Sequence, residues 1–276
     1  MNNFKLSGFG DESGNTIEEQ IRVLQKNNIN NIEIRNVNGK VIISYSDDEL
    51  KLIKKQLDAG GIKVSAIGSP IGKTAIIEDF SLTLESFERA VMAAEILEAP
   101  YIRAFSFYIP NGEDPMKWAD DVVSRLTELV KIAGLRGKKY ALENESGIFT
   151  DIPERCAYVL NKIPEMCFVF DPSNFIMNNA DTLEAWNMLK KRVTYFHIKD
   201  GTREPRRPVP AGEGEGKIPE ILKAAFSGGY DNYLSIEPHL KYMSHLNNAQ
   251  QFTTAANALK KILNNAFNVG LELAEV

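Results

Sequence analysis

The sequence predicts a single (β/α)8 barrel, a TIM barrel, that spans residues 1–276. Apolar runs alternate strictly with helical segments, and this alternation favours a closed barrel over an open sheet. The length of 276 residues suits one such barrel, which typically has about 250 residues. Four of the apolar runs also end in polar residues, namely Glu143, Asp171, His197 and Glu237. Because barrel chemistry gathers at the carboxyl ends of the strands, this pattern also predicts where the site lies.

Eight apolar runs are expected to form the strands of the barrel. In chain order they cover residues 4–9, 30–35, 62–68, 100–107, 138–143, 167–171, 193–199 and 232–237. The segments that follow them have the length and apolar spacing of helices. These helical segments cover residues 16–28, 47–60, 81–98, 115–134, 152–163, 182–191, 217–227 and 247–266.

Several of these helices carry recognisable start and stop signals. Asp47 and Asp48 precede the segment ELKLIKKQL, and Asp151 lies just before Pro153, which suits a first helical turn. Glycine pairs follow the second and seventh helices, as expected where a helix ends. The last residues, 266–276, have no partner in the alternation and are expected to form an extra carboxyl-terminal tail.

Composition and charge restrict the class of protein. The hydrophobic content of 43% and charged content of 25% are those of an ordinary globular protein with a full core. The net charge of −5 and the lack of a long basic run argue against nucleic acid as a partner. No signal peptide and no bilayer-spanning run is recognisable, so we expect a cytoplasmic protein without membrane contact. The two cysteines lack metal-binding spacing and are expected to pack in the core.

Strand parity gives an independent test of the predicted site, because residues two apart along a strand share a face. His197 and Lys199 share one face of their strand, opposite two apolar residues. The same alternation predicts inward-facing polar side chains on the second, fifth and eighth strands, namely Glu33, Arg35, Glu143 and Glu237.

Three carboxylates and one imidazole predict a site for one divalent metal ion, held by Glu143, Asp171, His197 and Glu237. The oxygen-rich set favours Mn²⁺, with Mg²⁺ and Co²⁺ as alternatives, and it suits Zn²⁺ less well. A sugar carbonyl and its neighbouring hydroxyl would fill the two open positions of the ion, which stabilises the enediolate formed when an α-proton leaves. Glu143 and Glu237 are the predicted proton-transfer groups.

Three further residues near these ligands have two interpretations each. Lys199 is the third predicted catalytic residue, and its alternative is an outward-facing or merely ion-paired lysine, for example one paired with Asp200. Glu145 is a candidate substrate contact or a cap for the next helix. His239 is expected to line the pocket from a loop rather than to act as a fifth ligand.

Two arginines complete the predicted substrate-binding set. Arg35 and Arg103 lie on the second and fourth strands, where they are able to bind a hydroxyl, a carboxylate or a phosphate group. An arginine at a strand end more often pairs with a neighbouring acid, which is the alternative for both.

The fragments LEN, FDPSN, FHIKD, an Ala-Gly-Glu-Gly loop and IEPH occur in an order that resembles the xylose-isomerase-like sugar phosphate isomerase/epimerase superfamily. The resemblance covers nearly the whole chain and implies a TIM barrel whose metal ligands are Glu143, Asp171, His197 and Glu237. Its endonuclease IV branch needs more histidines than the three of this chain. Epimerases of the superfamily usually have a substrate-binding histidine where this chain has Asn174, for which a turn residue is the alternative.

The sequence therefore predicts an isomerase or epimerase that acts on a sugar, ketose or keto-polyol by proton transfer. One alternative is a metal-dependent dehydratase of the inosose or dehydroshikimate type. Another is a sugar-binding barrel without turnover, against which the complete ligand set and Lys199 argue. The sequence does not determine the oligomeric state, and a homo-oligomer is one of the states that it allows.

Overall fold

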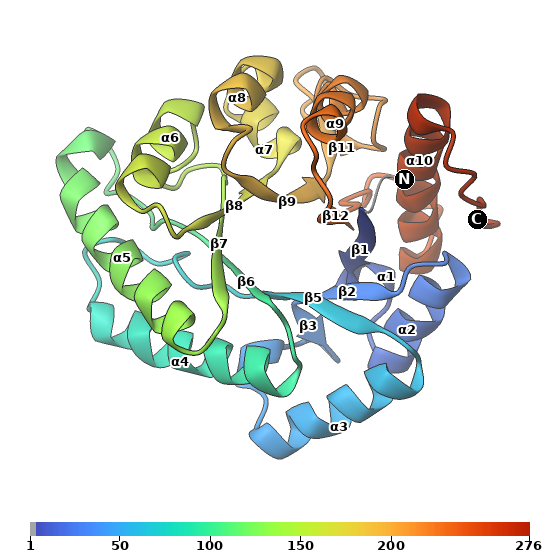
Figure 1. Cartoon of the computed structure of the whole chain (residues 1–276), viewed down its shortest axis with the longest axis horizontal. Helices are drawn as coiled ribbons and strands as arrows, with labels where there is room; N and C mark the ends of the chain where they lie inside the picture. Colours follow the sequence, from blue (N-terminus) through green and yellow to red (C-terminus); the bar gives the residue numbers. More distant parts are fainter. Residues whose placement is uncertain (1–3) are drawn as a thin grey trace.

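A computed structural model describes residues 4–276 and shows a closed barrel of parallel strands (Figure 1). Its strands are β1 (Lys5–Phe9), β2 (Asn31–Ile34), β5 (Lys63–Gly68), β6 (Tyr101–Ala104), β7 (Lys139–Glu143), β8 (Cys167–Phe170), β9 (Val193–Ile198) and β12 (Tyr233–Ile236). Around the barrel they follow the order β1, β12, β9, β8, β7, β6, β5, β2, so each strand pairs with its neighbours along the predicted alternation. The predicted single (β/α)8 barrel is confirmed.

The predicted helices surround the barrel as an outer ring (Figure 1). They are α2 (Ile17–Lys26), α3 (Asp47–Ala59), α4 (Phe80–Ile96), α5 (Ala119–Leu135), α6 (Pro153–Lys162), α8 (Thr182–Leu189), α9 (Ile218–Ser227) and α10 (Asn248–Phe267). Capping boxes start three of them, formed by Thr16 with Glu19, Ser46 with Glu49, and Asn247 with Gln250. Each box satisfies two backbone N–H groups that the helix itself leaves without a partner.

Short elements lie between the strands and the main helices. The sequence did not predict them, except that the 3-10 turn Pro115–Trp118 forms the beginning of the helix predicted over residues 115–134. Two are helices, α1 (Gly10–Ser13) and α7 (Pro172–Met177), and two more are 3-10 turns, η1 (Ile42–Ser44) and η2 (Pro115–Trp118). Four are strands of two antiparallel hairpins: β3 (Asn36–Val37) with β4 (Lys40–Val41), and β10 (Asp200–Thr202) with β11 (Arg207–Val209). Helices α1 and α7 directly follow barrel strands, and each of the two hairpins begins just after one. These elements therefore build the carboxyl-terminal rim of the barrel.

The fourth predicted strand, 100–107, is too long at its carboxyl end, because β6 stops at Ala104. Beyond that point Phe107 takes a positive φ of 74°, which a strand does not allow. Its N–H donates to the carbonyl of Gly72 in the loop after β5. Gly72 has a φ of +81°, and a Cβ there would lie 2.2 Å from the carbonyl oxygen of Phe105. The two loops therefore approach closely because this position is glycine.

The residues after α10, expected to form a tail without a partner, lie along the helix instead. The side-chain amide of Asn257 forms hydrogen bonds with both the N–H and the carbonyl of Ala274. The amide of Asn264 does the same with Leu271. Between them, buried Lys260 donates to the carbonyl of Glu272.

Within residues 4–276, no helix has the length and apolarity required to cross a bilayer.

Aromatic packing between the strands and the helices supports the wall of the barrel near β8. The buried ring of Phe170 has its centroid within 5.8 Å of those of Phe175, Trp186 and Phe196. These rings cover the outer face of the strand that leads into Asp171. Aromatic pairs of this kind stabilise the fold beyond the area that they bury.

Replacing Phe170 by alanine should therefore lower the free energy of unfolding by about 3–5 kcal/mol, because it leaves a cavity among close-packed rings. Chemical denaturation measures this loss. Leu52→Ala is the control, since Leu52 is 64% exposed on α3 and its replacement should change stability by less than about 0.5 kcal/mol. Equal effects of the two substitutions would contradict the packing described here.

Candidate metal centre

Four neighbouring strands supply the residues that the sequence singled out. Glu143 is the last residue of β7, and Asp171 follows β8 directly as the N-cap of α7. His197 lies near the end of β9, and Glu237 follows β12. Parallel pairing sets Ser235 beside His197, so Glu237 projects from the same face two residues later. All four side chains therefore enter the barrel at its carboxyl-terminal edge.

The structure brings these four side chains together around His197 Nδ1. That nitrogen lies 3.0 Å from Glu143 Oε1, 3.6 Å from Glu237 Oε2 and 4.0 Å from Asp171 Oδ2. One donor atom from each residue lies within 4.8 Å of the others, and all four residues are buried. This spacing matches a site in which a single cation contacts every donor.

Two observations show that the site suits a divalent cation. Within the described chain, Asp171 Oδ2 and Glu237 Oε2 are buried oxygens without a hydrogen-bond partner. Lys199 Nζ lies 2.7 Å and 3.1 Å from them, close enough for ionic attraction. The site also gathers more buried carboxylates than buried lysine and arginine side chains: Glu33, Glu143, Asp171 and Glu237 against Arg103 and Lys199. With His197 neutral, as a metal ligand must be, a dication would balance this excess of negative charge.

The other ring nitrogen of His197 contacts Glu33, a residue that strand parity placed inward without assigning it a role. His197 Nε2 lies 3.1 Å from Glu33 Oε2, which also accepts hydrogen bonds from Tyr195 and Ser235. Glu33 is fully buried on β2. A carboxylate behind a histidine ligand fixes the ring and directs its other nitrogen to the metal. Glu33 therefore favours Nδ1 as the donor.

The four candidate ligands differ in electrostatic surroundings. Burial by itself would raise the pKa of Glu143, but His197 and Arg103 outweigh it and lower that pKa to about 2. Burial raises the pKa of Asp171 to about 7, because nearby Lys199 offsets it only in part. Burial also opposes ionisation of Glu237, yet Lys199 and His239 hold its pKa well below the ordinary value. Glu143 and Glu237 are thus carboxylates at neutral pH.

Lys199 faces the site and forms no ion pair with Asp200, the partner considered from the sequence. Its ammonium lies between Asp171 and Glu237, whose attraction raises the Lys199 pKa well above the ordinary value despite burial. Asp200 instead accepts four backbone N–H groups, those of Gly201, Gly212, Gly214 and Gly216. Lys199 is therefore an inward-facing, ion-paired lysine, and only the predicted partner Asp200 is wrong. The glycine-rich loop instead surrounds the Asp200 carboxylate.

Arg103 and Asn174 both contact Glu143 from the sides. Arg103 Nε lies 3.2 Å from Glu143 Oε2 and 3.4 Å from Glu33 Oε1, and the side chain is buried. The Asn174 amide donates to Glu143 Oε1 and to the carbonyl of Asn144. Its backbone N–H donates to Asp171 Oδ1, the N-cap of α7, so Asn174 lies in the first turn of this helix and not in a separate turn.

Arg35 and His239 reach Glu237 from the rim. Arg35 Nη1 lies 3.5 Å and His239 Nε2 3.1 Å from Glu237 Oε1. Both also pair with Glu12 on α1, at 3.3 Å and 2.8 Å. Asp11 also contacts Arg35, at 2.9 Å from its Nε. Asp11 and Glu12 were missed by sequence reasoning, because they lie on α1, beyond the end of β1, where strand parity does not apply.

A cavity of about 200 Å³ opens above these residues. Its charged lining includes Arg35, Lys73, Arg103, Glu143, Glu145, Lys199, Glu237 and His239. Glu145 pairs with Lys73 at 2.8 Å. Helix capping by Glu145 is excluded for the next main helix, because α6 begins at Pro153 with Ile152 as its N-cap. Asp171 and His197 lie below the lining, so a ligand in the cavity meets Glu143, Lys199 and Glu237.

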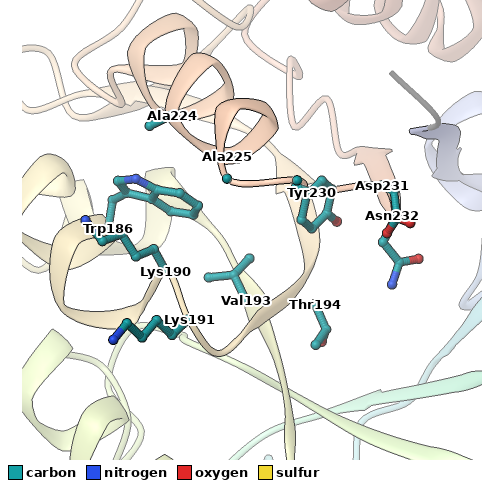
Figure 2. A pocket seen from close by; sticks show the side chains of 12 residues that line it. Trp186, Lys190, Lys191, Val193, Thr194, Ala224, Ala225, Tyr230, Asp231 and Asn232 are labelled. Atoms are coloured by element: carbon teal, nitrogen blue, oxygen red, sulfur yellow. The ribbon is translucent and has the colours of Figure 1, made fainter. Parts of the chain in front are cut away.

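A larger hollow of about 480 Å³ lies elsewhere, beside α8, α9 and the beginning of β9 (Figure 2). Trp186, Val193 and Tyr230 line it, with Lys190 and Lys191 on the side of α8. It adjoins the amino-terminal ends of the strands, the face of a barrel that serves stability. Its lining contains one acid, Asp231, and no histidine, whereas Glu143, Glu237 and His239 line the smaller cavity.

Comparison with known proteins shows the family of the chain. The family model described as xylose isomerase-like TIM barrel matches residues 21–262. An uncharacterised protein of Methanocaldococcus jannaschii, MJ1311, is 26% identical over 165 residues. That match covers 56% of this chain and 56% of the relative, so the chain spans only about half the length of MJ1311.

Solved structures share the fold at low sequence identity. A D-tagatose 3-epimerase-like protein is 18% identical with a TM-score of 0.78, over 96% of this chain and 98% of the other. The IolI protein with a bound zinc atom is 18% identical with a TM-score of 0.77, over 96% and 100%. The probable 3-DHS dehydratase AsbF of Bacillus anthracis is 15% identical with a TM-score of 0.75, over 93% and 98%.

The purified protein should bind one divalent ion per chain at the four-residue centre, and chelation should remove it. Elemental analysis and titration with Mn²⁺ measure the stoichiometry. At one hundred times its dissociation constant the ion should stabilise the fold by about 2.7 kcal/mol, which thermal unfolding detects. His197→Ala should abolish this stabilisation. A metal-free protein whose unfolding is insensitive to divalent ions would contradict the centre.

Proposed function

The chain belongs to the xylose isomerase-like TIM barrel family, and we propose that it is a metal-dependent isomerase or epimerase of a sugar, ketose or keto-polyol. Members of this fold among its structural neighbours include a 3-epimerase-like protein, IolI and a probable dehydratase. The proposal for this chain rests on the arrangement of its own residues in the cavity.

The observation that carries the proposal is the pair of glutamates that face one cavity. Glu143 and Glu237 come from β7 and β12, which are separated by β8 and β9 around the barrel. Both have lowered pKa values, because cationic neighbours outweigh the effect of burial. Two carboxylates on separate sides of a bound carbon allow one to take a proton from one face. The other, after it has been protonated by water in the cavity, is able to return a proton to the opposite face.

The remaining residues of the site bind and orient. Glu143, Asp171, His197 and Glu237 would hold the ion, and Mn²⁺ is the one that we propose for this oxygen-rich set. When bound, such an ion polarises a carbonyl and stabilises the negative charge that forms beside it. Lys199 donates hydrogen bonds to a substrate oxygen from the cavity lining, while Arg103 and Asn174 keep Glu143 in place.

A dehydratase is the second candidate, and a specific observation favours it. Elimination of water needs an acid near the leaving hydroxyl, and both Lys199 and His239 line the cavity next to Glu237. The attraction of Glu237 and the contact with Glu12 raise the pKa of His239 to about 9 although burial opposes this. A protonated imidazole at the rim is thus available. The paired glutamates nevertheless favour isomerisation or epimerisation.

The test is a screen of ketoses, inososes and keto-acids with the Mn²⁺-loaded protein in deuterated buffer. An isomerase or epimerase should introduce deuterium at carbon while conserving the mass of the skeleton, which NMR and mass spectrometry detect. An ultraviolet-absorbing enone or dione formed with loss of water would support the dehydratase. Binding of a sugar without exchange or turnover across the screen would contradict both enzymes and favour a sugar-binding barrel.

Glu237→Gln should leave the barrel folded and lower turnover by at least about 10²-fold, because it removes a proton-transfer carboxylate. The metal content of the variant is measured alongside, so that loss of the ion is recognised as a contribution. Glu128→Gln on the exposed face of α5 is the matched control and should retain full turnover. Near-normal turnover of Glu237→Gln would contradict the assigned role.

A further inference from the structure

The two carboxylate oxygens of Glu237 have different surroundings. Oε1 faces two cationic side chains, His239 at 3.1 Å and Arg35 at 3.5 Å. Oε2 is buried and has no hydrogen-bond partner within residues 4–276. It lies 3.6 Å from His197 Nδ1 and 3.1 Å from Lys199 Nζ, both of which belong to the candidate metal centre. The contacts on Oε1 therefore orient the carboxylate, and Oε2 is the oxygen directed at the candidate metal centre.

Both cations that contact Oε1 also contact Glu12, whereas the neighbouring Asp11 contacts Arg35, at 2.9 Å from its Nε. Glu12 Oε1 lies 2.8 Å from His239 Nε2 and 3.3 Å from Arg35 Nη2. Glu12 Oε2 accepts the backbone N–H of His239 at 2.7 Å. One carboxylate thus binds the ring and the main chain of His239 together with the guanidinium of Arg35. Its side chain is 14% exposed, so water screens these contacts only weakly.

His239 needs such a contact because its position is conformationally demanding. Its φ is +47°, a left-handed conformation that costs free energy for a residue with a side chain. The side chain is also 39% exposed, so packing restricts it less than its buried neighbours. The bond from the His239 N–H to Glu12 holds the loop after β12 in this conformation.

We infer that Glu12 is a positioning residue for the metal centre: through His239 and Arg35 it fixes Glu237 so that Oε2 is presented to the ion. This inference rests on the proposed metal site and extends it to α1, which follows β1, the strand that pairs with β12. Glu12 acts through other side chains, so it is expected to govern metal affinity rather than to take part in proton transfer.

A second ion is the competing interpretation, since Glu12, Glu237 and His239 also have donor atoms within 4.8 Å of one another. Arg35 argues against it. Its guanidinium already lies beside Glu12 Oε1 and Glu237 Oε1, and its charge would repel a dication placed between them. The carboxylates of Glu12 and Glu237 are therefore already paired with the guanidinium of Arg35.

The experiment measures Co²⁺ binding by the full chain, without substrate, through chelator competition and the visible absorption of the bound ion. Glu12→Gln keeps the size of the side chain and removes its charge, so Co²⁺ affinity should fall about 10–100-fold and the absorption bands should shift. Glu85→Gln, on the exposed face of α4, is the matched control and should match the parent. Thermal unfolding verifies that each variant is folded.

A double-mutant cycle with His239→Asn makes the test independent of any one variant, because asparagine tolerates a positive φ. If Glu12 acts partly through His239, the loss caused by Glu12→Gln should be smaller in the His239→Asn background. Parent-like Co²⁺ affinity in Glu12→Gln, strict additivity in the cycle, or a second ion lost in Glu12→Gln would overturn the inference.

These outcomes are distinct from failure of the proposed reaction. A protein that binds Co²⁺ more weakly after Glu12→Gln yet turns over no ketose supports the positioning role and contradicts the proposed isomerase. An active enzyme whose Co²⁺ affinity is indifferent to Glu12 retains the proposed function and loses the inference. A parent protein that binds no Co²⁺ overturns both.

Discussion

The concentration of buried negative charge at one end of the barrel is the constraint on which the site depends. Glu33, Glu143, Asp171 and Glu237 lie close together where solvent does not screen them. Carboxylates survive such burial only when cations and hydrogen-bond donors surround them. Arg103 and Lys199 supply part of that compensation, and the remaining deficit is what makes a divalent ion suitable. The closed sheet keeps the group in place, because parallel neighbours fix the height at which each side chain enters.

The sequence could predict the barrel and the four central residues for a physical reason. Apolar runs that alternate with helices allow few topologies, and packing alone rarely places a charged residue at the end of a buried strand. The same logic located Lys199 on the inner face and gave the main helices nearly correct bounds, although it extended the strand ending at Ala104 through a loop. Patterns with period two or 3.6 therefore carried these predictions.

Contacts between loops were beyond the same logic. Glu12 lies in a short helix beyond the end of β1, outside the strand pattern, and its partner His239 is far along the chain. Lys73 and Glu145 likewise meet across the cavity from separate loops. Such pairs depend on how the rim folds over the barrel, which no local spacing encodes. Glu33 was placed inward, yet its contact with His197 Nε2 depends on the closure of the sheet through β1 and β12.

The way in which the residues after α10 bind to that helix determines which substitutions they tolerate. Asn257 and Asn264 contact only main-chain atoms of Ala274 and Leu271, as a neighbouring β-strand would. Such recognition ignores side-chain identity but requires an N–H at each bonded position, so proline is the one residue excluded on chemical grounds. These hydrogen bonds therefore let the exposed residues of the segment vary while its path over the helix is retained, whereas Val269 and Leu271 also pack against the hydrophobic core.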